Sequence, residues 1–158
     1  MTAAQETLRL TTTPETVEWP ETHYVFIEKD GPFMSSAPAA WTELHAARPE
    51  IEKHNTITRY FSAYKVGPQI YRAGVAVSET PSDLPDGVRY EVLPGGKFAS
   101  FTLTGPFRHL PEATSRAVRM MEESGLALRD AFNIEQYVTD PRVTPEEELR
   151  TDILFPLA

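Results

Sequence analysis

The sequence has 158 residues, no cysteine and a formal net charge of -8. This length is typical of one domain with a sizeable core, and 41% hydrophobic with 24% charged residues is an ordinary globular composition. The acidic balance disfavours direct binding to nucleic acid or to an anionic membrane surface, and it favours cationic ligands. The lack of cysteine excludes disulfides, thiol nucleophiles and cysteine metal sites.

The N-terminus carries no basic segment followed by an apolar one, and no apolar run approaches the ~18–20 residues that a membrane span needs. We therefore expect a cytoplasmic protein with a single domain over residues 1–158.

The first half of the chain predicts an edge strand within 7–17, and then a strand, a helix and two further strands, all within residues 7–77. β-Branched and aromatic runs indicate the strands, and apolar residues at three- and four-residue spacing indicate the helix. A loop rich in proline and aspartate follows over residues 78–87. The predicted elements are a strand over 22–29, a helix over 36–48 closed by Pro49, and strands over 56–66 and 69–77 around a turn at Gly67-Pro68.

The second half repeats this order within residues 88–157. It begins with two strands that flank Pro94-Gly95-Gly96, which we interpret as the turn of a hairpin. The predicted elements are strands over 88–93 and 97–104, a helix over 109–124, and a closing pair of strands over 132–138 and 151–157.

The repeated order indicates an internal duplication. Gly31-Pro32-Phe33 and Gly105-Pro106-Phe107 each lie between a strand and a helix, and the segment 60–64 matches 133–137. We therefore expect an α+β fold of two strand-helix-strand-strand units, about 7–77 and 88–157, related by a pseudo-two-fold. Their antiparallel sheets would join, and the two main helices would flank a central groove.

Glu135 is a single carboxylate in the apolar and aromatic run 132–138. Residues two apart on a strand share a face, so Glu135 and Tyr137 point the same way. If that face is covered, the carboxylate needs hydrogen bonds, a basic partner or a cation from outside. Its counterpart in the first unit is Ser62, so the repeat itself does not require the charge. A purely structural alternative pairs Glu135 with Arg59 or Arg72.

These motifs together resemble the GyrI-like (gyrase-inhibitor-like) effector-binding domains, which also form the C-terminal ligand-binding half of AraC-type and MerR-type multidrug regulators. The resemblance is strongest over 88–157 and looser in the first half, where Gly31-Pro32-Phe33, Trp41 and Leu44 carry it. The pattern in the second half is Gly105-Pro106-Phe107, then Ile134-Glu135-Gln136-Tyr137 with Asp140-Pro141, and finally Thr151-Asp152-Ile153 with Phe155-Pro156-Leu157.

The resemblance implies a groove for lipophilic, often cationic and aromatic compounds, with Glu135 at its centre. The ligand-binding residues that we expect are Glu135, Tyr137, Trp41, Tyr64 and Phe107. Phe107 stands where the family commonly has a tyrosine, and the alternative for all four aromatic residues is a place in the core.

Three functions follow from these observations. The first is a stand-alone binding protein for lipophilic cations, acting as a multidrug sensor or by sequestration, because no helix-turn-helix pattern flanks the two units. The alternative is a hydrolase that opens the cyclopropane rings of DNA-alkylating natural products, as some members of the resembling family do, with Glu135 and Tyr137 positioning and deprotonating water. The third is a regulator that binds a protein partner such as gyrase. No specific residue of the sequence supports this third function. We expect no cofactor and no metal, since the four histidines lack metal-ligand spacing.

Overall fold

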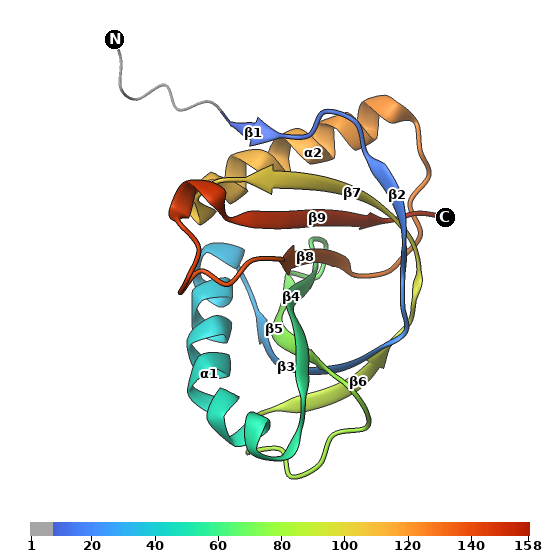
Figure 1. Ribbon diagram of the computed structural model, residues 1–158. Helices are drawn as coiled ribbons and strands as arrows, with labels where there is room; N and C mark the ends of the chain where they lie inside the picture. The colour runs from blue at the N-terminus through green and yellow to red at the C-terminus, as the bar shows by residue number, and fades with distance from the viewer. Residues whose placement is uncertain (1–7) are drawn as a thin grey trace.

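Nine antiparallel strands form one continuous sheet in the computed structural model, which describes residues 8–158 (Figure 1). The strand order is β1-β7-β9-β8-β4-β5-β3-β6, and β2 pairs with β7 outside this path. The strands are β1 (Arg9–Leu10), β2 (Glu15–Trp19), β3 (Thr22–Asp30), β4 (Ile57–Lys65), β5 (Ile70–Val77), β6 (Arg89–Leu93), β7 (Gly96–Thr104), β8 (Asn133–Tyr137) and β9 (Arg150–Pro156).

The two long helices pack on the same face of this sheet. α1 (Phe33–His54) covers β3, β4 and β5, and α2 (Leu110–Ser124) covers β7 and β9. Two short 3₁₀ turns, η1 (Phe107–His109) and η2 (Glu146–Glu148), complete the elements of the described residues. The other face encloses its own core, which includes Trp19, Tyr24, Phe26, Phe61 and Phe98. The predicted α+β class is thus confirmed.

α1 is longer than the predicted helix 36–48, since it begins at Phe33 and continues past Pro49 to His54. The prediction that Pro49 closes the helix was wrong. Proline removes one helical hydrogen bond, but Ile51 beyond it is fully buried against the sheet. Burial of such a side chain is worth about 1.5–3 kcal/mol, which helps to offset the lost bond.

The second predicted helix, 109–124, agrees with α2 to within one residue. Gly125 ends it in a left-handed conformation with φ of 73°. The predicted closing pair of strands is confirmed as β8 and β9, and the predicted hairpin at Gly67-Pro68 as β4 and β5. The predicted first unit begins at Thr7, which lies outside the described residues.

No helix in residues 8–158 is both long and apolar enough to cross a bilayer.

The hairpin predicted around Pro94-Gly95-Gly96 does not form. β6 pairs with β3, whereas β7 pairs with β1, β2 and β9. The two-residue connection between β2 and β3 likewise joins two strands that do not pair with each other, because β2 pairs with β7. Each connection contains a proline, Pro20 or Pro94, which cannot donate a ladder hydrogen bond. The sequence therefore marks two points where the chain changes its pairing partner.

The two connections touch each other at Gly95. A Cβ atom at this position would collide with the carbonyl oxygen of Trp19 and would lie 2.8 Å from the backbone nitrogen of Glu21. Backbone atoms cannot move aside as the end of a flexible side chain can. Only glycine therefore fits where the connections pass.

We predict that Gly95→Ala destabilises the protein by about 1–3 kcal/mol, the usual cost of forcing an extra carbon into a packed site. The measurement is the midpoint of urea unfolding. Gly67→Ala is the matched control, because no atom lies within 4 Å of a Cβ added there. Equal midpoints for the two variants would contradict the proposed contact between the connections.

Candidate functional site

Glu135 lies at the middle of the sheet. β8 stands between the strands that α1 covers and those that α2 covers (Figure 1). Across β8, Glu135 faces Ser62 on β4 and Ile153 on β9, and both neighbours are fully buried. The face it shares with Ser62 is the face on which the helices pack, since Phe61 and Ile134 belong to the opposite core. Glu135 itself is half-buried.

Within residues 8–158, the Glu135 carboxylate accepts one hydrogen bond from a side chain. The Tyr137 hydroxyl donates to Oε1 of Glu135 at 2.7 Å and also lies 3.3 Å from the Ser62 hydroxyl. Glu135 and Tyr137 therefore share a face, as the strand alternation predicts. No ion pair involves Glu135 in the part of the chain that the structure describes.

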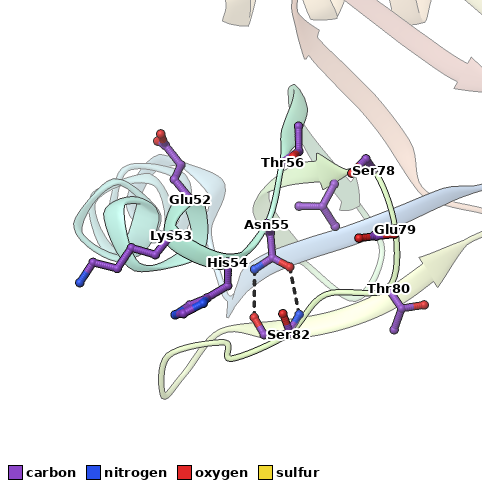
Figure 2. A pocket seen from close by; sticks show the side chains of 10 residues that line it. Glu52, Lys53, His54, Asn55, Thr56, Ser78, Glu79, Thr80 and Ser82 are labelled. Atoms are coloured by element: carbon purple, nitrogen blue, oxygen red, sulfur yellow. Dashed lines mark hydrogen bonds between the residues drawn. The ribbon is translucent and has the colours of Figure 1, made fainter.

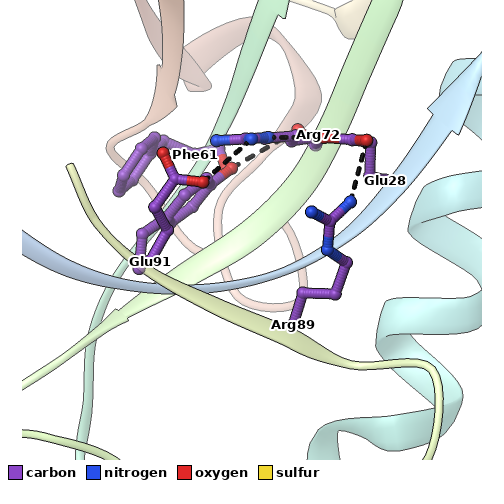
Figure 3. A network of polar contacts seen from close by, with 6 residues as sticks. Glu28, Phe61, Arg72, Arg89 and Glu91 are labelled. Atoms are coloured by element: carbon purple, nitrogen blue, oxygen red, sulfur yellow. Dashed lines mark hydrogen bonds and ion pairs between the residues drawn. The ribbon is translucent and has the colours of Figure 1, made fainter.

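The two arginines considered as structural partners are placed elsewhere. Arg72 is buried and pairs with Glu28 at 2.9 Å and with Glu91 at 3.1 Å (Figure 3). Its guanidinium also lies over Phe26 and Phe132, at 4.2 and 4.3 Å from the ring centroids. Arg59 lies over Trp19 at 5.0 Å. Neither arginine neutralises Glu135.

Aromatic rings surround the Glu135–Tyr137 pair. Trp41 of α1 packs edge-on against Tyr137 with 5.3 Å between centroids, and Phe107 of η1 does so at 5.7 Å. Tyr64, which is buried, stacks on Tyr71 at 6.5 Å. Trp41 is anchored, since its Nε1–H donates to the Tyr71 hydroxyl at 2.8 Å. Four of the five predicted site residues thus form one chain of contacts, and Tyr64 joins it through Tyr71.

Burial sets the electrostatics of these groups. It raises the pKa of Glu135, and the hydrogen bond from Tyr137 lowers that pKa only in part. Burial, together with the nearby Glu135 charge, also raises the pKa values of Tyr64, Tyr71 and Tyr137. The tyrosine hydroxyls therefore stay protonated. The Glu135 carboxyl group ionises less readily than that of a glutamate in water.

Two residues of this cluster were not predicted from the sequence as site residues. Tyr71 faces Tyr64 directly across the β4–β5 hairpin. Phe33 packs on both tyrosines at 5.6 and 5.9 Å. The register implied by the turn at Gly67-Pro68 was the signal that could have found Tyr71.

The structure contains two cavities of interest. One, of about 380 Å³, is lined by Phe107 and lies beside Tyr137. The other, of about 290 Å³, lies where α1 ends (Figure 2). There the Asn55 side chain exchanges two hydrogen bonds with the Ser82 backbone, at 3.0 and 2.9 Å. None of the predicted site residues lines this second cavity.

Removing the Glu135 charge should stabilise the free protein at neutral pH. The folded-state pKa is raised, so the destabilising effect of ionisation is absent below the ordinary value of 4.5 and grows as pH rises through the folded-state pKa. We predict that Glu135→Gln resists urea better than wild type at neutral pH and equally well in acid. Glu123→Gln, an exposed position on α2, should show no such gap. A constant difference at all pH values would contradict the shifted pKa.

Three solved structures are similar to this chain. The C-terminal domain of EcmrR is 19% identical with a TM-score of 0.77, over 97% of this chain and 99% of that domain. SAV2435 bound to tetraphenylphosphonium is 13% identical with a TM-score of 0.62, over 92% and 93%. A hydrolase from Listeria innocua is 15% identical with a TM-score of 0.60, over 94% and 93%. At these identities, the likeness shows a common fold.

No curated protein sequence matches the chain significantly. The family of GyrI-like small molecule binding domains matches residues 12–158. Since this match spans nearly the whole sequence, the chain belongs to the GyrI-like small molecule binding domains.

Proposed function

We propose that this domain binds lipophilic, cationic aromatic small molecules, with Glu135 as the central carboxylate of the site. The observation that carries the proposal is a carboxylate among aromatic rings that has no cationic partner within residues 8–158. The remaining proposed ligand contacts are Tyr137, Trp41, Tyr64 and Phe107.

The chemistry of the site selects the class of ligand. An ionised carboxylate at a half-buried position is costly unless a cation compensates it. Small hydrated cations would have to give up their water, whereas an organic cation with delocalised charge is easily desolvated. Such a ligand also gains from the faces of Trp41, Tyr137 and Phe107 through cation–π contacts, worth about 0.5–2 kcal/mol each. The tetraphenylphosphonium bound to SAV2435 has this chemistry and supplies a probe.

We further propose that the site lies in a groove on a pseudo-two-fold axis between two duplicated units. The strand order supports this, because β7-β9-β8 in one half is matched by β3-β5-β4 in the other. The register supports it as well. Ser62 faces its proposed equivalent Glu135, and the flanking pairs Phe61–Gln136 and Ala63–Ile134 would exchange under the rotation. The groove would run between α1 and α2, and Glu135 would be its one asymmetric charge.

The test is a fluorescence titration with a rhodamine dye, backed by calorimetry with tetraphenylphosphonium. Glu135→Gln preserves the shape of the side chain, so we expect a loss of about 1–3 kcal/mol, or about five- to 150-fold in affinity. The affinity for triphenylphosphine oxide, a neutral aromatic probe, should fall much less on the same substitution. Glu123→Gln changes the net charge equally and should bind as wild type does. Equal cation affinity in wild type and Glu135→Gln would make Glu135 structural and would refute the assignment.

The contact between Glu135 and Tyr137 favours one second candidate, a hydrolase that opens cyclopropane rings. A carboxyl group with a raised pKa is closer to the operating range of a general base or acid, and the Tyr137 hydroxyl at 2.7 Å could orient it toward water. The aromatic rings would hold the substrate in place.

Incubation with a cyclopropane-containing alkylator separates the two functions. Under the binding proposal, wild type and Glu135→Gln should give ring-opened product at the same background rate, measured by chromatography. Product formed at least ten-fold faster by wild type would instead establish the hydrolase, since loss of a general base typically removes about 10²–10⁴-fold in rate. Tyr137→Phe would then test whether the hydroxyl takes part.

A further inference from the structure

A cavity of about 380 Å³ lies one aromatic ring away from the Glu135–Tyr137 pair. Phe107 forms part of its wall and packs edge-on against Tyr137, with 5.7 Å between ring centroids. Phe107 as a residue is also 37% exposed, so protein does not enclose it on every side. Phe107 is thus the partition between the proposed cation site and the cavity.

The fold builds this cavity from two segments far apart in the sequence, residues 106–108 and 141–149. They are joined at two levels. The backbone N–H of Gly105 donates to the carbonyl of Leu149 at 2.8 Å, and an ion pair links Arg108 to Glu146. Leu149 is buried, whereas both charged residues are exposed. A backbone hydrogen bond and an ion pair therefore hold together the two segments that line the cavity.

The lining of the cavity is chemically different from the Glu135 site. Its charged residues, Arg108 and Glu146, are paired with each other, so the cavity presents no uncompensated carboxylate. The nearby Asp140 is likewise paired, with Arg142 at 2.9 Å. The other lining residues are mainly apolar: Pro106, Phe107, Pro141 and Leu149, with Thr144. A neutral alkyl group can pack on these apolar residues, and the ion pair leaves no carboxylate of the lining free for a second cation.

We propose that the ligands of this domain are amphiphilic monocations, with an aromatic cationic head at Glu135 and an alkyl tail that passes Phe107 into the cavity. This inference rests on the proposed function, because it presupposes the head at Glu135. Phe107 supports it, since its apolar ring packs on Tyr137 and also lines the cavity, so a tail that leaves the head along this ring would reach the cavity without crossing a hydroxyl. The cavity is also far larger than the ~30 Å³ that one water molecule occupies in the liquid, so it has room for several methylene groups.

The experiment is a calorimetric titration with triphenylphosphonium cations that carry a methyl, butyl, hexyl or decyl chain. Each methylene that enters the cavity should tighten binding by about two- to four-fold, the value expected for burial of a CH₂ group. The gain should stop at the chain that fills the cavity. A hexyl chain ending in an ammonium group should lose this gain, because the cavity offers its charge no partner.

Thr144→Phe locates the gain, since the new ring would fill the cavity without touching Glu135. We expect this variant to bind the methyl compound as wild type does and to show little increase with chain length. Thr80→Phe, at the other cavity, is the matched control and should keep the full increase. If Thr144→Phe does not fold, the ammonium-tailed compound and the chain series on wild type decide the question.

The outcomes separate the two proposals. A methyl compound that binds wild type better than Glu135→Gln, with no gain from longer chains, overturns the tail cavity and leaves the cation site intact. An increase in affinity with chain length that persists in Thr144→Phe likewise overturns the tail cavity and leaves the cation site intact. If the methyl compound binds wild type and Glu135→Gln equally, the cation site fails, and the tail proposal fails with it.

Discussion

The pairing of β4 with β8 is the contact on which the site depends. It joins the strands under α1 to those under α2, and it places Ser62 and Glu135 opposite each other at the centre of the sheet. A carboxylate at such a position is normally neutralised by the protein. Here its only hydrogen bond from a side chain within the described residues comes from Tyr137, and the surroundings are aromatic. The sheet thus holds in place a charge that the described residues do not compensate. Under the proposed function a cationic ligand would compensate it, and the site would stabilise the complex at the expense of the empty protein.

The aromatic rings link the β8 pair to three other elements. Trp41 of α1 and Phe107 of η1 pack on Tyr137, and Tyr64 of β4 lies close enough to feel the charge of Glu135. Trp41 is also held by the Tyr71 hydroxyl. Binding selectivity would therefore depend on how these elements are spaced. A shift of α1 against the sheet would move Trp41 relative to Tyr137 and so alter the site without altering any charge.

Much of the fold could be predicted from local patterns, because alternation, turn residues and helical spacing act over short distances. Glu135 and Tyr137 share a face as predicted, and α2 ends at Gly125. Alternation could even have excluded Arg59, which is three residues from Ser62 and thus on the other face. The α1 terminus and the Pro94-Gly95 connection were predicted wrongly, because burial of Ile51 and the pairing of β6 with β3 are tertiary effects. The cavity beside Phe107 has no sequence signature, since residues 106–108 and 141–149 meet only in the folded chain.

The crossing of the two connections at Gly95 also bears on how the domain can assemble. Within the described part of the chain, β7 is the one pairing partner of β2, and β6 pairs with the outer edge of β3. Strands from each half therefore complete the sheet of the other half. During synthesis the N-terminal half leaves the ribosome with β2 unpaired and one edge of β3 open, until residues 89–104 emerge. Open strand edges are sites of misassociation between chains. For the same reason, a proteolytic cut in the loop 78–87 would not release two separable domains, because the fragments would remain joined by the strand pairs β1–β7, β2–β7, β3–β6 and β4–β8.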